Sequence, residues 1–308
     1  MNANLNNNLV LARGMGFFAA IGRGWKLSKL SFSVVKADPE ILVYVLLMGT
    51  MSLATFSAMN APFFLEMDWA VIMTTDSITN EEVVGGLTNA GMAWYFSFYM
   101  LLSIIVVFWN SAIVANSHMR LSGGDPTFVY GVKKALSKIH LIMIWGMISG
   151  TVGLVLKLIR NTNAREVKNP GLQILFMILT WMFEVAWWIM TFFMIPLMVI
   201  EGRSIRDSMR EGKDMMMKTF GTNIASGLGI EFIGFCFIVL SVLIGVVIGM
   251  GLGLLPGIVV GVLGVALTLM WVTAANTVSI SALYIFAKTG EMPQIYKDNG
   301  VNSFQFNV

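Results

Sequence analysis

Six long apolar stretches constrain the fold of this chain more than any other feature. Each has about 18 residues or more, the length at which an α-helix crosses the hydrocarbon core of a bilayer. They cover residues 41–64, 93–115, 139–158, 172–200, 223–252 and 257–287. Charged residues are only 12% of the 308, about half the fraction of a soluble domain. These values exclude soluble enzymes, nucleic-acid-binding proteins and disordered chains. They predict one all-α membrane domain over 1–308, with a six-helix bundle over 41–287.

The distribution of basic residues predicts the orientation of the chain. Sixteen Lys and Arg residues precede the first stretch, follow the second and fourth, or lie in the tail, against four between the third and fourth. Because basic residues concentrate on the cytoplasmic side, we expect both termini in the cytoplasm of a cell-membrane protein. The four exceptions either cap a long third helix or mean that the spans are drawn wrongly, so the side of loop 157–172 stays open: Lys157, Arg160, Arg165 and Lys168.

The chain ends and the first loop are polar. Residues 1–12 are rich in Asn, which predicts a flexible segment rather than a secretory signal. Residues 288–308 are expected to form a cytoplasmic tail. The loop after the first stretch is acidic, with no basic residue, and is either a cation or partner patch or an ordinary solvated loop: Glu66, Asp68, Asp76, Glu81 and Glu82.

Basic amphipathic segments precede the first, third and fifth stretches, which suggests a module repeated three times. The first is an expected interfacial helix over 13–40. In the second, Asp125 and Pro126 predict the N-cap and first turn of a helix. Such helices lie in the membrane interface. The predicted lipid-headgroup contacts are Arg23, Lys26, Lys29, Lys133, Lys134, Arg206 and Arg210.

Glycines recur every four residues near the C-terminus, a spacing that lets membrane helices approach closely. The short turn at 253–257 makes this row two faces of a helical hairpin. Internal packing is the preferred interpretation, and an oligomer or pore-lining face is the alternative. The predicted packing residues are Gly245, Gly249, Gly253, Gly257 and Gly261. Pro196 is expected to kink or end the fourth span.

Two carboxylates and two amides lie inside the apolar stretches: Glu184, Glu231, Asn110 and Asn276. A charge in the membrane is a hypothesis for a functional site. The alternative is a neutral Glu that is hydrogen-bonded to Ser, Thr or Asn, and it is preferred because no basic residue seems to match Glu184. The two Asn residues are expected to hydrogen-bond between helices.

The sequence contains no motif that carries chemistry. Cys236 is the single cysteine, and His118 and His140 are the two histidines. No nucleophile, phosphate-loop or metal-ligand spacing is present. We therefore expect no catalytic residue, no cofactor, no metal and no nucleic-acid partner.

Several motifs resemble a family of prokaryotic multi-pass membrane proteins that is described only as a domain of unknown function. The matching segments are 24–32, 37–40, 108–112, 123–127, 192–196, Glu201-Gly202, 282–284 and 289–293. The family is distantly similar to the membrane domains fused to glycerophosphodiester phosphodiesterases, whose catalytic part has no counterpart here. The resemblance implies a fold and a membrane location and no established activity.

The leading hypothesis for function is a non-enzymatic scaffold or accessory subunit that binds lipids and other membrane proteins, including a second copy. The alternative is a channel or transporter for a small solute, with Glu184 and Glu231 as polar determinants. An intramembrane lipid enzyme is the third candidate and the least favoured, because clustered acid–base residues are missing.

Overall fold

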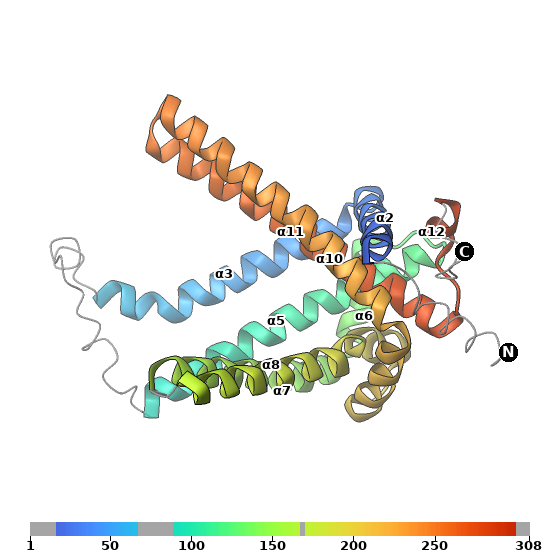
Figure 1. Cartoon of the computed structure of the whole chain (residues 1–308), viewed down its shortest axis with the longest axis horizontal. Helices are drawn as coiled ribbons and strands as arrows, with labels where there is room; N and C mark the ends of the chain where they lie inside the picture. Colours follow the sequence, from blue (N-terminus) through green and yellow to red (C-terminus); the bar gives the residue numbers. More distant parts are fainter. Residues whose placement is uncertain (1–16, 67–88, 167–169, 300–308) are drawn as a thin grey trace. The chain divides into compact units, whose positions relative to one another are not determined.

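The chain is all-helical in the parts that the structure, a computed structural model, describes: residues 17–66, 89–166 and 170–299 (Figure 1). Six segments are long and apolar enough to cross a membrane, which confirms the predicted fold class. They are Glu40–Ala61, Ala93–Leu121, Ile139–Arg160, Gly171–Glu201, Gly229–Leu252 and Leu254–Thr289. Residues 1–12, the acidic loop beyond Glu66 and the last residues of the tail lie outside the described ranges.

The helices follow the chain with short connections. Their bounds are α2 (Phe17–Ala37), α3 (Glu40–Glu66), α5 (Asn89–Leu121), α6 (Phe128–Leu136), α7 (Ile139–Glu166), α8 (Pro170–Thr191), α9 (Met194–Pro196), a π-helical turn η2 (Leu197–Glu201), α10 (Ile205–Leu252), α11 (Leu254–Thr289) and α12 (Gln294–Asp298). They divide into two compact units. The first contains residues 1–46, 109–139 and 185–308, and the second contains residues 47–108 and 140–184.

The first unit is organised by α10 and α11, which pack along each other and against α2. One of its cores joins Phe193 and Leu197 to Met216 and Leu283. At the other end Tyr44 stacks on Phe128 with ring centroids 4.9 Å apart and donates a hydrogen bond of 2.7 Å to its carbonyl.

The second unit packs α5 against α7 through small residues of α7. A Cβ at Gly146 would lie 2.9 Å from the Ile104 Cα, and one at Gly150 would lie 3.0 Å from the Ser103 Cβ. The hydroxyls of Ser103 and Ser149 are 2.9 Å apart across the same contact. Close approach and a small hydrogen bond are the usual means of helix association in a membrane.

The start of α6 corrects one expectation. Thr127, and not Asp125, is the N-cap: its hydroxyl accepts a hydrogen bond of 3.3 Å from the Tyr130 amide. Asp125 instead forms an ion pair of 2.7 Å with Arg120. The first helical residue therefore follows the proline by two positions, and the capping rule is met by the next hydroxyl along the chain.

The expected repeat holds for two of its three copies. A break at Asp38-Pro39 separates α2 from α3, and one at residues 137–138 separates α6 from α7. Before the fifth span the prediction of a separate interfacial helix is wrong, because α10 continues for 48 residues from Ile205 to Leu252. Its sequence has no proline, so nothing removes a backbone donor and the hydrogen-bond ladder continues.

Pro196 interrupts the fourth span as predicted. α8 ends at Thr191, and the chain resumes as α9 and η2 before ending at Gly202 with φ +70°. Proline has no N–H and its ring crowds the carbonyl four residues earlier, which belongs to Phe192. The break therefore begins where the lost hydrogen bond would have been.

Candidate functional site

Glu184 is ion-paired, which corrects the expectation that it has no basic partner. Both Nε and Nη2 of Arg160 donate to its Oε1 atom, with the Nε bond at 2.8 Å. The Glu184 side chain keeps 25% of its area exposed and that of Arg160 keeps 64%. Pairing is what makes two charges tolerable within a membrane span.

Glu231 fits the preferred alternative better. The Asn276 amide of α11 donates a hydrogen bond of 3.0 Å to its Oε1 atom on α10. One residue along, the Thr277 hydroxyl donates to the Asn110 Oδ1 atom on α5 at 3.4 Å. Both amides thus join helices of the first unit, which is the interhelical role expected of them.

The C-terminal glycines face each other across the α10–α11 hairpin. A Cβ at Gly257 would lie 2.5 Å from the Gly249 Cα, and one at Gly245 would lie 2.9 Å from the Gly261 Cα. Gly253, with φ +102°, forms the turn between the two helices. The backbones therefore touch where a side chain would separate them, in agreement with internal packing.

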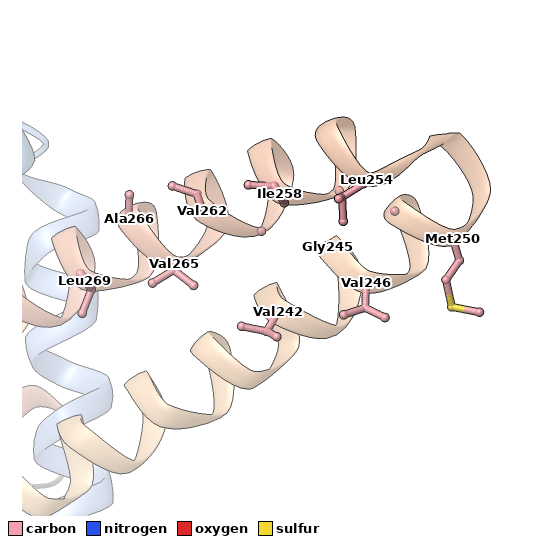
Figure 2. A pocket seen from close by; sticks show the side chains of 13 residues that line it. Val242, Gly245, Val246, Met250, Leu254, Ile258, Val262, Val265, Ala266 and Leu269 are labelled. Carbon is pink, nitrogen blue, oxygen red and sulfur yellow. The ribbon is translucent and has the colours of Figure 1, made fainter. Parts of the chain in front are cut away.

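The same glycines form the floor of an open groove along the hairpin (Figure 2). It encloses about 780 Å³ and is lined by Val, Leu, Ile, Met, Ala and Gly: Val242, Gly245, Val246, Gly249, Met250, Leu254, Gly257, Ile258, Gly261, Val262, Val265, Ala266 and Leu269. Its walls stand at the surface, since Met250 is 85% and Val262 62% exposed. Such a groove offers dispersion contacts and no hydrogen bond or charge.

The predicted headgroup residues lie on helices of the first unit. Lys26 and Lys29 are exposed on α2, and Lys133 and the half-buried Lys134 lie on α6. Arg206 and Arg210 are exposed on the first turns of α10. Arg23 belongs to α2, but its side chain lies outside the described residues.

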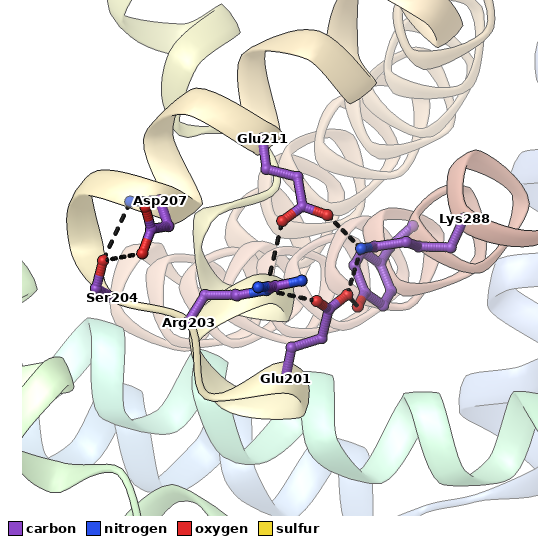
Figure 3. Close-up of polar contacts among 7 residues, drawn as sticks. Glu201, Arg203, Ser204, Asp207, Glu211 and Lys288 are labelled. Carbon is purple, nitrogen blue, oxygen red and sulfur yellow. Dashed lines mark hydrogen bonds and ion pairs between the residues drawn. The ribbon is translucent and has the colours of Figure 1, made fainter.

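A charged network joins η2, α10 and α11 (Figure 3). Glu201 accepts from the Tyr284 hydroxyl at 2.5 Å, lies 2.7 Å from the Lys288 ammonium and 3.0 Å from Arg203 Nε. Glu211 pairs with Lys288 and lies 3.5 Å from Arg203. Hydrogen bonding to Glu201 raises the pKa of the Arg203 guanidinium. Two carboxylates and two cations balance, so the network holds helix ends together rather than attracting an ion.

Asp38 is a buried carboxylate between α2 and α3, only 3% exposed. Neither of its oxygens has a hydrogen-bond partner among the described residues. Burial, followed by the neighbouring Glu40 carboxyl, raises the pKa of Asp38 to about 7. The proton bound at this pH supplies the donor that two carboxylates lack.

Sequence reasoning missed the charged network, the burial of Asp38 and the role of Arg160. The motif Glu201-Gly202 pointed to the network without its partners, because Lys288 lies 87 positions along the chain. Asp38 reads as a turn residue before Pro39. Arg160 was counted as a loop residue, although α7 continues to Glu166.

No chemistry is evident in the part of the chain that the structure describes. Within residues 17–66, 89–166 and 170–299, no three Asp, Glu, His or Cys side chains are grouped so that they could hold a metal ion. Cys236 is exposed on α10.

These helices define a multi-pass membrane protein. The chain belongs to a family of unknown function, DUF6159, whose model matches residues 89–293, two thirds of its length. The matched region runs from α5 to the end of α11, and so includes the hairpin groove and the charged network. No curated protein matches the chain.

Proposed function

We propose that this protein is a non-enzymatic membrane scaffold or accessory subunit that binds lipids and other membrane proteins, a second copy included. The observation that carries the proposal is the apolar groove on the α10–α11 hairpin. We further propose that it lies in the cell membrane of a prokaryote with both termini in the cytoplasm. Labelling tags at residues 5 and 305 in intact cells tests this orientation, and labelling of either tag from outside contradicts it.

The groove supports binding of lipid acyl chains. Its lining belongs to two candidate spans, Gly229–Leu252 and Leu254–Thr289, so hydrocarbon surrounds it in a bilayer. The lining offers no polar partner that a headgroup or a solute would need. Surface glycines leave a recess in which a flexible chain gains contact on three sides.

The basic helices support binding to the polar part of the membrane. Lys26 and Lys29 of α2, Lys133 of α6, and Arg206 and Arg210 of α10 are exposed. Each such residue near an anionic surface contributes about 1 kcal/mol of attraction. Groove and basic helices together give the protein contacts with both acyl chains and headgroups.

A substitution that fills the groove tests lipid binding. Ala266 lines the groove, whereas Leu267 does not line it and is 57% exposed. We expect Ala266→Trp to reduce the number of phospholipids that stay bound in native mass spectrometry from mild detergent. The matched variant Leu267→Trp should retain the wild-type number. Equal retention in both variants contradicts lipid binding in the groove, and a second copy bound in place of lipid assigns the groove to a protein helix.

The alternative is a channel or transporter for a small solute. The observation that favours it is the Arg160–Glu184 ion pair within the candidate spans. In reconstituted vesicles, flux of a solute that is lost on Glu184→Gln, with normal yield of folded protein, would reverse the order of the two proposals.

The accessory role also agrees with the likeness to the membrane domains of glycerophosphodiester phosphodiesterases. Those domains accompany a catalytic domain and do not themselves perform the reaction. We propose the same kind of role here, in which the helices bind a membrane-associated partner. Co-purification of one defined partner that dissociates when Arg206 and Arg210 are replaced by Gln would support it.

A further inference from the structure

Two basic side chains of α7 lie in the second unit, away from the basic helices discussed above. Lys157 and Arg160 are the first two of the four residues that oppose the predicted orientation. Their side chains face α5 and α8: the Lys157 ammonium donates to the Tyr99 hydroxyl at 2.5 Å, and Arg160 binds Glu184 of α8.

The Arg160 guanidinium is only partly used by Glu184. Nε and Nη2 both donate to one oxygen, Oε1, which occupies one edge of the planar group. The guanidinium has five N–H donors in a fixed fork, so Nη1 and one N–H of Nη2 point elsewhere. No second acceptor contacts them among the residues that the structure describes, and 64% of the side chain is exposed.

Lys157 adds a second charge one turn earlier on the same helix. Its ammonium also lies 5.0 Å from the centre of the Tyr99 ring. The ammonium has three donors, of which Tyr99 accepts one. Residues three apart in a helix lie on the same side, so the two cations are neighbours.

The surrounding residues mark the level at which phospholipid headgroups lie. The apolar span of α7 ends at Arg160. Trp and Tyr concentrate at membrane interfaces, and the exposed aromatic residues Trp94, Tyr95 and Trp181 belong to the same unit. The Trp94 indole also donates to the Met59 carbonyl at 3.1 Å, as expected where an aromatic ring meets polar groups.

We propose that Arg160 and Lys157 bind the phosphate of a phospholipid headgroup. The free Nη1–Nη2 edge matches two phosphate oxygens, and Lys157 supplies a second charge. Glu184 acts as a positioning residue, because it holds the opposite edge of the guanidinium and fixes its direction. The inference rests on the proposed function as a lipid-binding protein and assigns one of its headgroup sites.

The test is a titration of the full-length protein in mild detergent with short-chain phosphatidylglycerol, followed by native mass spectrometry. The key variant is Arg160→Gln/Glu184→Gln, which removes both charges and keeps two hydrogen-bonding amides. We expect its affinity for the lipid to fall about tenfold or more. Lys133→Gln, a control that removes one exposed charge from α6 of the other unit, should change the affinity by less than about twofold.

Two further measurements keep the outcome decisive. Arg160→Lys retains the charge but not the two-donor edge, so it should bind more weakly than the wild type even if the double variant fails to fold. Inorganic phosphate in place of the lipid separates a lipid site from a general anion site, and equal affinity for both overturns the lipid assignment.

The result that overturns the proposal is unchanged phosphatidylglycerol affinity in folded Arg160→Gln/Glu184→Gln or Arg160→Lys protein. If the wild type still retains lipid that Ala266→Trp loses, only the headgroup site is refuted. If the wild type binds no phospholipid under any of these conditions, the proposed function fails as well.

Discussion

Two pairs of antiparallel helices in this protein are held together by opposite means. In the α10–α11 hairpin, backbone contacts backbone at Gly245, Gly249 and Gly257. In the α7–α8 pair, a guanidinium and a carboxylate meet between helices whose exposed surface is apolar. The first association needs the absence of side chains, and the second needs two particular ones.

The difference shows how each pair can serve a function. Glycine packing satisfies the hairpin completely and leaves an apolar groove beside the contact. The ion pair of α7 and α8 leaves donors of Arg160 unused. A membrane protein can therefore present a hydrocarbon surface from one pair and a polar site from another, and the following predictions test this contrast.

The largest effect is expected from Gly257→Leu. Even its Cβ would lie 2.6 Å from the Gly245 carbonyl oxygen and 2.5 Å from the Gly249 Cα, which are backbone atoms that cannot move aside. We expect the free energy of unfolding to fall by about 3 kcal/mol or more. Thermal unfolding in detergent measures it.

The matched control for this variant is Gly251→Leu. A Cβ at Gly251 meets nothing within 4 Å, so the melting temperature should stay close to that of the wild type. An equal loss in both variants would mean that helix propensity, and not backbone contact, holds the hairpin together.

Glu184→Leu is expected to destabilise the α7–α8 pair by about 1–2 kcal/mol. It leaves Arg160 charged and unpaired within the span, and a guanidinium cannot lose its proton. Arg160→Leu should cost less, because a lone Glu184 can become neutral. The double variant should recover most of the stability, and equal losses in the two single variants would contradict this asymmetry.

Asp38 is a third case, a buried carboxylate with no donor partner. Its pKa of about 7 lies above the value in an unfolded chain, so the native state binds the proton more tightly. The free energy of unfolding should therefore fall as the pH rises from about 4 to about 7, by about 1 kcal/mol after allowance for screening.

Chemical unfolding of wild type and Asp38→Asn at several pH values measures this dependence. The variant has no proton to lose at this position, so its curve should be flatter over the same range. Parallel curves would show that Asp38 does not titrate between these values.

The smallest effect is expected from the hydrogen bond between α5 and α7. Ser103→Ala or Ser149→Ala should reduce the free energy of unfolding by about 0.6 kcal/mol, the average for such bonds in a membrane protein. A double-mutant cycle gives the coupling energy of the two hydroxyls. Coupling above about 2 kcal/mol would mean that polar contacts, rather than close packing, dominate this unit.

The sequence predicted features that depend on local periodicity. The six spans followed from runs of apolar residues, the hairpin from glycines four apart, and the interruption of the fourth span from Pro196. Each is a property of one segment of chain, which is why a pattern could indicate it.

Features that join distant residues were beyond such reasoning. Arg160 and Glu184 are 24 positions apart, and their pairing depends on the rotation and register of two helices. The network of Glu201 with Lys288 and the burial of Asp38 also depend on packing. The continuous helix α10 was missed for another reason: a change from basic to apolar composition was read as a break, although only the backbone decides where a helix ends.

The central claim is that the protein acts by binding lipid and protein within the membrane. Purification from native membranes in mild detergent, with the mass and composition of the particle determined, tests it most directly. We predict a particle heavier than the 33.9-kDa chain, with bound phospholipid and either a second copy or a defined membrane protein in fixed ratio. A lipid-free monomer whose reconstitution gives solute flux dependent on Glu184 would contradict it.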